Sequence, residues 1–483
     1  MILERSLAIA TPLQLSDAIA LAQLSLGNTA RAQSDPSSAL KYYQQVASAS
    51  PILLVQAQVN QLSLLADTKQ GVAMQELLPQ VQQQIEALPP SRTAIEARIN
   101  LAQTMLKSNA ANPLPIGKQA SLKIAQLLAT AVQQAKDLGD PRTQSYAIGT
   151  LGSVYEQTQQ WLEAEKLTQQ ALQLGQQINA ADVAYRWQWQ LGRVLKGQGK
   201  NEGAIAAYKE AVNTIKSLRA DLAAASPDVQ FSFRDGVEPI HRELVGLLVQ
   251  SNQQEDLKAA RDVIESLQLV ELDNFFREAC LNANPEQVDQ VDRRAAVIYP
   301  IILEDQLAII VSLPEAEGKS QGRNLRYYKT AVSPERIKRL AADIREDLDQ
   351  PNTLSITLPQ LQKMYDLLLR PEAAELAASR VETLVFILDG ALRNLPMAAL
   401  HDGKKFLLEQ YSVAVTPGLQ LLAPRALKQE RLSVLVAGLD AARLPAFSAL
   451  PYVETEVQKI KSEVSSQVLF NQGFTNLAVS KMW

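Results

Sequence analysis

Residues that could perform nucleophilic catalysis are scarce in this sequence of 483 residues, which contains one cysteine and two histidines. A thiolate nucleophile requires a histidine or another base within hydrogen-bond reach. Cys280 lies two residues after Glu278 near the end of a predicted helix, where a neighbouring carboxylate disfavours the thiolate. We therefore interpret Cys280 as a small apolar residue of that helix, because free cysteines usually pack in this way.

For both histidines, a structural role is the simpler interpretation. His241 lies on a predicted helix, and we interpret it as a helix-surface residue. His401 precedes Asp402-Gly403, a pair typical of a tight turn, and we interpret it as a solvated turn residue. A single cysteine excludes a multi-cysteine zinc site, and two histidines leave little else to bind a metal. We therefore predict no metal site and no cofactor.

One group of side chains has the spacing of a binding surface. Arg186, Trp189, Arg193 and Lys196 follow one another at intervals of three, four and three residues, which places all four on one face of a helix. Three cations and one tryptophan suit an acidic segment or a terminal carboxylate, because arginine donates two hydrogen bonds to a carboxylate. The alternative is a solvated helix face with one exposed aromatic, or a face that later helices cover.

The composition excludes several classes of partner. The net charge is −4, which provides no basic field to attract nucleic acid or an anionic membrane. No apolar run approaches the roughly 20 residues that cross a bilayer, and the N-terminus lacks the pattern of a secretory signal peptide. We therefore predict a cytoplasmic protein without a nucleic-acid or membrane partner, and we leave its oligomeric state open.

A repeat of 40 residues organises the first half of the sequence. Leu151-Gly152 recurs as Leu191-Gly192, and Ala164 recurs as Ala204 at the same offset of 40 residues. Apolar residues at helical spacing on both sides of a polar break predict two helices in each repeat. We expect the glycines to face a small alanine of the second helix. A single hairpin cannot bury its apolar stripe, so the repeats must stack.

This pattern predicts a series of helical hairpins along residues 1–225. The hairpins cover residues 17–48, 51–88, 91–138, 141–178 and 181–224, of which the first and the last two fit the pattern best. Gly197-Gln-Gly199-Lys-Asn-Glu-Gly203 superficially suggests a phosphate-binding loop. Its final spacing is wrong and it follows a helix rather than a strand, so we interpret it as the turn between two helices.

The pattern changes after the repeats. Residues 226–290 are predicted to form a helical connector, and from residue 291 onward short β-branched runs alternate with helices. Strands are expected near residues 295–303, 307–311, 325–329, 383–388, 411–415, 433–437 and 468–470, with helices at 334–348, 359–369 and 451–464. Strands that alternate with helices predict an α/β region with a largely parallel sheet.

Both halves resemble known families. The repeats resemble the tetratricopeptide (TPR) repeat, although Ile148 and Gln188 stand where that family has a tryptophan. Residues 384–401, 406–411 and 416–422 resemble the CHAT domain, a bacterial caspase-like domain that characteristically follows TPR repeats. The fold class expected is therefore an all-α TPR superhelix (α-solenoid) over residues 1–225, the connector over 226–290, and an incomplete α/β caspase-like domain over 291–483.

The resemblance implies cysteine peptidase chemistry, and it implies that the catalytic histidine and cysteine follow the segment that matches Leu469–Thr475. This sequence ends at Trp483 before either motif, so we expect a truncated domain without catalytic residues, and loose folding from about residue 381. Two functions stay open. One is a protein-interaction or scaffold protein that binds a protein or peptide through the TPR groove. The other is a cysteine endopeptidase, of which this chain is a truncated or frame-shifted product.

Overall fold

The computed structural model describes most of the chain. The described residues are 2–47, 50–110, 117–223, 237–276, 294–314, 324–350, 354–416, 434–440, 450 and 452–475. They form two compact units, residues 1–422 and 423–483, each of which is described by itself. Within the described residues, no helix is both long enough and apolar enough to cross a membrane.

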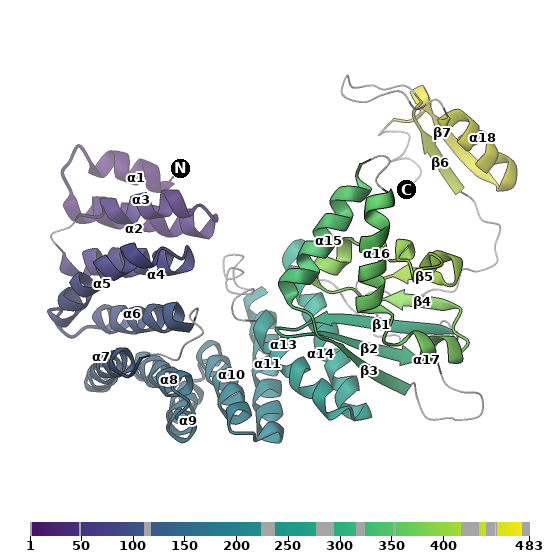
Figure 1. The fold of residues 1–483 in the computed structure, drawn as a ribbon. Helices are drawn as coiled ribbons and strands as arrows, with labels where there is room; N and C mark the ends of the chain where they lie inside the picture. The colour runs from purple at the N-terminus through teal and green to yellow at the C-terminus, as the bar shows by residue number, and fades with distance from the viewer. Residues whose placement is uncertain are drawn as a thin grey trace. The chain divides into compact units, whose positions relative to one another are not determined.

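The first unit begins with antiparallel helices that stack in sequence order (Figure 1). Several helices begin with proline at a first position, where its missing N–H costs nothing, and Asp35 and Asp140 cap two of these helices by accepting a backbone N–H. The helices are α1 (Ile2–Ala10), α2 (Ser16–Ala32), α3 (Pro36–Gln45), α4 (Pro51–Asp67), α5 (Gly71–Glu86), α6 (Arg92–Ala110), α7 (Lys118–Asp137), α8 (Pro141–Gln157), α9 (Trp161–Gln177), α10 (Ala181–Gly197) and α11 (Asn201–Ala223).

One backbone device recurs in the turns between helices. Several described turns between consecutive helices place a single residue in the left-handed region, as at Gln159 (φ 59°), Asn179 (φ 52°) and Gly199 (φ 75°). Such a residue ends a helix by redirecting the chain. Gly199 therefore belongs to the turn between α10 and α11, as the sequence indicated.

The glycines of the repeat do not face alanines, which corrects the expectation from the sequence: Gly152 approaches the side chains of Gln190 and Thr168, and Gly192 approaches an aromatic ring. A Cβ atom on Gly192 would lie 2.9 Å from the ring of Tyr208, and one on Gly149 would lie 2.4 Å from the ring of Trp187. Gly27 approaches the ring of Tyr43 in the same way. Removal of the side chain on one helix thus makes room for a large, fully packed ring on its neighbour.

A five-stranded sheet follows two further helices, α13 (Glu238–Ser251) and α14 (Gln254–Phe276). Its order is β3-β2-β1-β4-β5, and its strands are β1 (Ala295–Ile302), β2 (Leu307–Leu313), β3 (Asn324–Thr330), β4 (Thr383–Phe386) and β5 (Ser412–Val415). The pairs β1–β2 and β2–β3 are antiparallel, whereas β1–β4 and β4–β5 are parallel. The sheet is therefore mixed, and the expectation of a largely parallel sheet was wrong.

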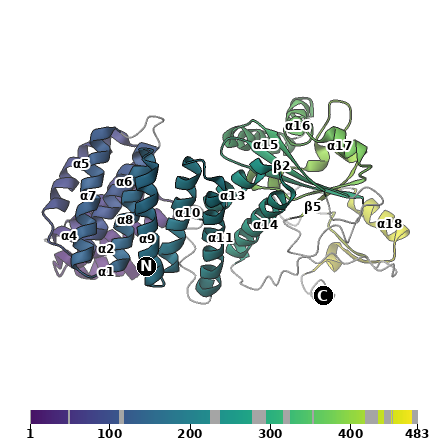
Figure 2. The same cartoon turned by 90° about the horizontal axis from the view of Figure 1, so that it is seen from below.

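Helices cover both faces of this sheet (Figure 2). Alternate residues of β1 point to opposite faces, so that Val297 and Tyr299 pack with α13 and α14 while Ala296 and Ile298 pack with α15 (Pro334–Leu348) and α16 (Leu354–Leu368). The short helix α17 (Ala373–Ala378) follows α16 and was not expected from the sequence. The predicted fold class, helical repeats followed by an α/β region, is confirmed.

Among the described residues beyond 381, several belong to regular strands and helices, and the expectation of loose folding there stays a prediction. β4 lies inside the sheet between β1 and β5, and its Leu384 and Phe386 side chains are completely buried. In the second unit, β6 (Val434–Gly438) pairs in parallel with β7 (Ser466–Phe470), and α18 (Val453–Glu463) connects them. Strands expected near 433–437 and 468–470 thus form a separate two-stranded sheet.

A buried acid lies in the turn between α16 and α17. Glu372 is 1% exposed, and among the described residues neither oxygen of its carboxyl group has a hydrogen-bond partner. Burial raises the pKa of Glu372 to about 8, because an ionised carboxylate is poorly solvated there. Glu375, three residues later, differs because Tyr328 and Arg326 both donate to its carboxylate, and these contacts lower its pKa.

We expect Glu372 to make the fold less stable as pH rises. Below pH 4.5 the carboxyl group is protonated in both states. Between about pH 4.5 and about pH 8 only the unfolded chain releases the proton, so the free energy of unfolding falls. Denaturant unfolding from pH 5 to pH 9 should show that Glu372→Gln removes most of this fall. Glu375→Gln is the matched control and should destabilise at neutral pH. Equal pH profiles for wild type and Glu372→Gln would contradict the assignment.

The close contact between Gly149 and the ring of Trp187 predicts that adding a methyl group at Gly149 destabilises the fold. Gly149→Ala should lower the free energy of unfolding by about 1–3 kcal/mol, because the ring of Trp187 is buried and cannot move aside. Gly71→Ala is the control, since a Cβ there meets nothing within 4 Å and should be neutral or stabilise by up to about 1 kcal/mol. Similar losses in both variants by chemical denaturation would show that the ring contact is not the cause.

Candidate functional site

A groove of about 550 Å³ opens along the first helices of three successive hairpins, α6, α8 and α10. Its lining includes three of the four tryptophans of the chain, Trp161, Trp187 and Trp189, together with Tyr146. Amide and hydroxyl side chains lie between the aromatic rings. A groove that combines rings with hydrogen-bonding groups can hold a chain segment through both its side chains and its backbone.

The structure brings three of the four predicted binding residues to this groove. Arg186, Trp189 and Arg193 line it, whereas Lys196 is exposed on α10 and is not among the lining residues. α10 reaches this position because its opposite side packs on α9 and α11, with Val183 and Val194 completely buried.

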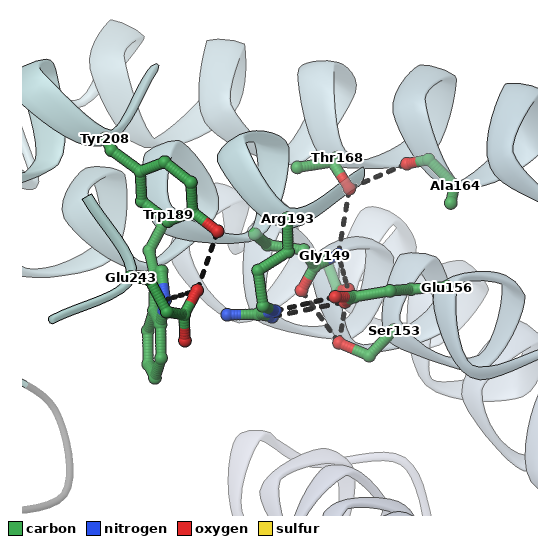
Figure 3. Close-up of polar contacts among 10 residues, drawn as sticks. Gly149, Ser153, Glu156, Ala164, Thr168, Trp189, Arg193, Tyr208 and Glu243 are labelled. Atoms are coloured by element: carbon green, nitrogen blue, oxygen red, sulfur yellow. Dashed lines mark hydrogen bonds and ion pairs between the residues drawn. The ribbon is translucent and has the colours of Figure 1, made fainter. Parts of the chain in front are cut away.

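Arg193 already has a carboxylate partner inside the protein. Its Nε donates to Oε1 of Glu156 at 2.6 Å, and a terminal nitrogen donates to Oε2 at 3.1 Å (Figure 3). The guanidinium also stacks on the ring of Trp189, with 4.5 Å from Cζ to the ring centroid. Burial alone would lower the pKa of Arg193, but Glu156 reverses this and the net shift is upward, so the group stays charged.

Trp189, whose ring face stacks on Arg193, is also hydrogen-bonded through its indole nitrogen to Glu243 of α13. The indole Nε1 donates to Oε2 of Glu243 at 3.1 Å, and the hydroxyl of Tyr208 donates to the same oxygen at 2.6 Å (Figure 3). Burial raises the pKa of Tyr208, and the adjacent Glu243 carboxylate raises it further, so the phenol remains a donor. The orientation of Trp189 in the groove therefore depends on α13.

A buried polar network supports the floor of the groove. Gln190 donates to the backbone oxygen of Gly149 at 2.9 Å and to the hydroxyl of Thr168 at 2.8 Å, and it accepts from Ser153 at 2.7 Å. Trp187 donates to the hydroxyl of Ser145 at 3.0 Å. Because these groups satisfy one another, the floor is rigid before any ligand binds.

Arg186 differs from the other cations of the groove. Lys107 is paired with Asp67 at 2.7 Å, and Arg193 is paired with Glu156. Arg186 is exposed, lies over the ring of Tyr185 at 5.3 Å, and forms no ion pair within the part of the chain that the structure describes. Arg186 is thus the cation that a bound carboxylate can reach without displacing an internal partner.

Ion pairs also connect the first helices of successive hairpins, α2, α4, α6, α8 and α10. Each neighbouring pair of these helices shares at least one contact between opposite charges. The contacts are Arg31–Asp67, Lys107–Asp67, Arg92–Asp140, Arg142–Asp182 and Arg193–Glu156. Spacing along the row of helices is therefore set partly by charge.

Both histidines are buried, although the sequence predicted exposed positions for them. His241 is 3% exposed and its Nδ1 lies 2.8 Å from the oxygen of Val237, so it is a core residue and not a surface residue. His401 is 8% exposed, and its Nδ1 accepts from the N–H of Gly403 at 3.0 Å, so it is a buried turn residue. In both cases a backbone group of a residue nearby in the sequence bonds Nδ1. Cys280 lies outside the described residues.

The sequence did not indicate Glu156 and Glu243, which bond the predicted residues Arg193 and Trp189, or Gln190, which bonds the floor of the groove. No group of three or more metal-binding side chains is present in the ranges that the structure describes. The arrangement can bind and orient a ligand.

These features define the class as a helical-repeat protein with a groove among its repeats and an α/β region that follows them. The sequence matches the tetratricopeptide repeat family over residues 143–217 and the CHAT domain family over residues 358–482. The chain therefore carries a TPR region followed by a CHAT domain. A comparison with curated protein sequences finds no match.

Solved structures with some likeness are distant. BtubC from P. vanneervenii is 15% identical over 53% of this chain and 94% of its own, with a TM-score of 0.35. A signal transduction ATPase with a tetratricopeptide repeat sensor from Pyrococcus horikoshii is 11% identical over 55% of this chain and 41% of its own, with a TM-score of 0.36. A Rap protein complexed with Competence and Sporulation Factor is 14% identical over 55% and 71%, with a TM-score of 0.34. These values are too low to inform function.

Proposed function

We propose that this protein is an interaction or scaffold protein whose repeat groove binds an extended segment of a protein partner. The observation that carries the proposal is the combination of Arg186, which has no ion pair within the described residues, with the aromatic lining of the groove. The TPR region over residues 143–217 supports it, because that region includes α8 and α10. The α/β region then serves as a platform that does not itself cleave peptides.

The charges of the groove favour a ligand with one carboxylate. Lys107 and Arg193 are neutralised by Asp67 and Glu156, so Arg186 supplies the cation. Arginine binds a carboxylate through two parallel hydrogen bonds. A side chain next to that carboxylate can pack against the half-buried ring of Trp189. We therefore propose an extended segment with an acidic residue, or a C-terminal carboxylate, beside an apolar residue.

The alternative is a cysteine endopeptidase, and the CHAT match over residues 358–482 favours it. A peptidase of this kind needs a histidine that is free to accept a proton from a thiol. His241 and His401 are both buried, and each has Nδ1 engaged by neighbouring backbone. A hydrogen bond at Nδ1 still leaves Nε2 of a histidine as a possible base, so burial is the argument against catalysis. His241 is 3% exposed and His401 is 8% exposed, which leaves a substrate little access to either ring, and we therefore propose that binding is the activity of this chain.

The binding proposal predicts opposite effects for two substitutions. Peptides of about ten residues with a single aspartate or glutamate would be tested beside copies that carry the corresponding amide. Arg186→Gln should weaken binding of the acidic peptides about tenfold and abolish the preference over the amides. Glu156→Gln should strengthen that preference, because Arg193 loses its internal carboxylate.

Lys166→Gln removes an exposed cation from α9 and is the matched control, which should leave binding unchanged. The variant Lys196→Gln tests whether the fourth binding residue predicted from the sequence contributes to the affinity for acidic peptides. Equal binding of acidic and amide peptides by the wild-type chain would refute the carboxylate specificity.

The peptidase alternative predicts cleavage that depends on a thiol. We expect no cleavage of a peptide library by the full chain, with or without a reducing agent, because both histidines are buried away from solvent. Mass spectrometry of the library would detect new termini. Cleavage that disappears in Cys280→Ala would overturn the binding proposal as the activity of this chain and support the enzyme.

A further inference from the structure

Two consecutive residues of α13 contact opposite parts of the first unit. Glu243 accepts hydrogen bonds from Trp189, which lines the groove, and from Tyr208 of α11. Arg242 extends to the sheet, where it donates to both carboxylate oxygens of Asp389 at 2.6 and 2.9 Å. One peptide bond therefore separates the contact with the groove from the contact with the sheet.

The contact on the sheet side lies where two parallel strands end. Arg242 also donates to the backbone oxygen of Ile302, the last residue of β1, at 2.8 Å. The carboxylate of Asp389, three residues after β4, accepts the N–H of Ile302 at 2.9 Å. The Asp389 side chain is only 2% exposed, and the guanidinium of Arg242 compensates the hydration that its carboxylate lacks there. The carboxyl ends of β1 and β4 are thus held together by one guanidinium.

The position of α13 is fixed by packing on the elements around it. Ile240, Leu244 and Leu248 are completely buried in the core that α13 shares with α11, α14 and β1. A packed helix moves as a body rather than bending at one residue. On the groove side, Trp189 lies under Arg193, so a ligand that touches either residue acts on Glu243.

We propose that α13 couples occupancy of the repeat groove to the carboxyl ends of β1 and β4. The assumption that a ligand occupies the groove rests on the function proposed above. The series of contacts through Trp189, Glu243, Arg242 and Asp389 is independent of that function. Coupling of this kind is reciprocal, so a change at the sheet also alters the affinity of the groove.

The coupling can be tested in the full chain without any ligand. Trp189→Phe retains a ring but removes the indole donor, and Tyr208→Phe removes the other donor to the same oxygen. Hydrogen exchange would be followed at the amides of Ile302 and Ile387, which bond to Asp389 and to the oxygen of Ile298. Each variant should exchange at least about threefold faster there, and the double variant faster still.

Trp161→Phe is the matched control, because Trp161 lines the same groove without touching α13 in the contacts of the described residues. It should leave exchange at Ile302 and Ile387 unchanged. Faster exchange confined to α10 and α13 in the two test variants would overturn the coupling, and so would equal acceleration by Trp161→Phe. Failure of acidic peptides to bind would instead count against the proposed function alone, since this experiment contains no peptide.

Discussion

The ion pair between Arg242 and Asp389 is the interaction on which the connection between helices and sheet depends. Asp389 is almost fully buried, and a carboxylate in such a place is tolerated only when charge and hydrogen bonds compensate its lost hydration. Arg242 provides both, and it also binds Glu238 on its own helix. Loss of one partner of a buried pair costs about 3–5 kcal/mol, which is a large part of the stability of a typical domain.

Much of the fold follows from local sequence patterns. The apolar runs near residues 295–303 and 307–311 predicted β1 and β2 because β-branched residues in short runs suit strands. The direction of these strands was predicted wrongly, although the signal was present. Only four residues separate Ile302 from Leu307, and so short a connection joins antiparallel neighbours, whereas a parallel pair needs a crossover of a dozen residues or more. Pairing of β6 with β7 apart from the main sheet depends on long-range packing, which local patterns do not contain.

The candidate site was predicted in part, and the repeat itself explains what was missed. Helical spacing placed Arg186, Trp189 and Arg193 on one face, and all three line the groove. Forty residues before Arg193 and Lys196 stand Ser153 and Glu156, which occupy the same face of the preceding repeat and also line the groove. This comparison would have shown that an internal carboxylate neutralises Arg193. The role of Glu243 could not be predicted, because this residue follows the repeats and nothing in its local sequence indicates a bond to Trp189.

Because ion pairs join the first helices of neighbouring hairpins, the strength of the contacts within the repeat array depends on the salt concentration of the solution. Each pair bridges two neighbouring helices, and several of the side chains are partly exposed. Dissolved ions screen exposed charges over about 8–10 Å at ordinary salt concentrations, so the bridges weaken as salt rises while the apolar contacts between the same helices strengthen or stay constant. The balance between charged and apolar contacts along the array therefore shifts toward the apolar contacts as ionic strength rises.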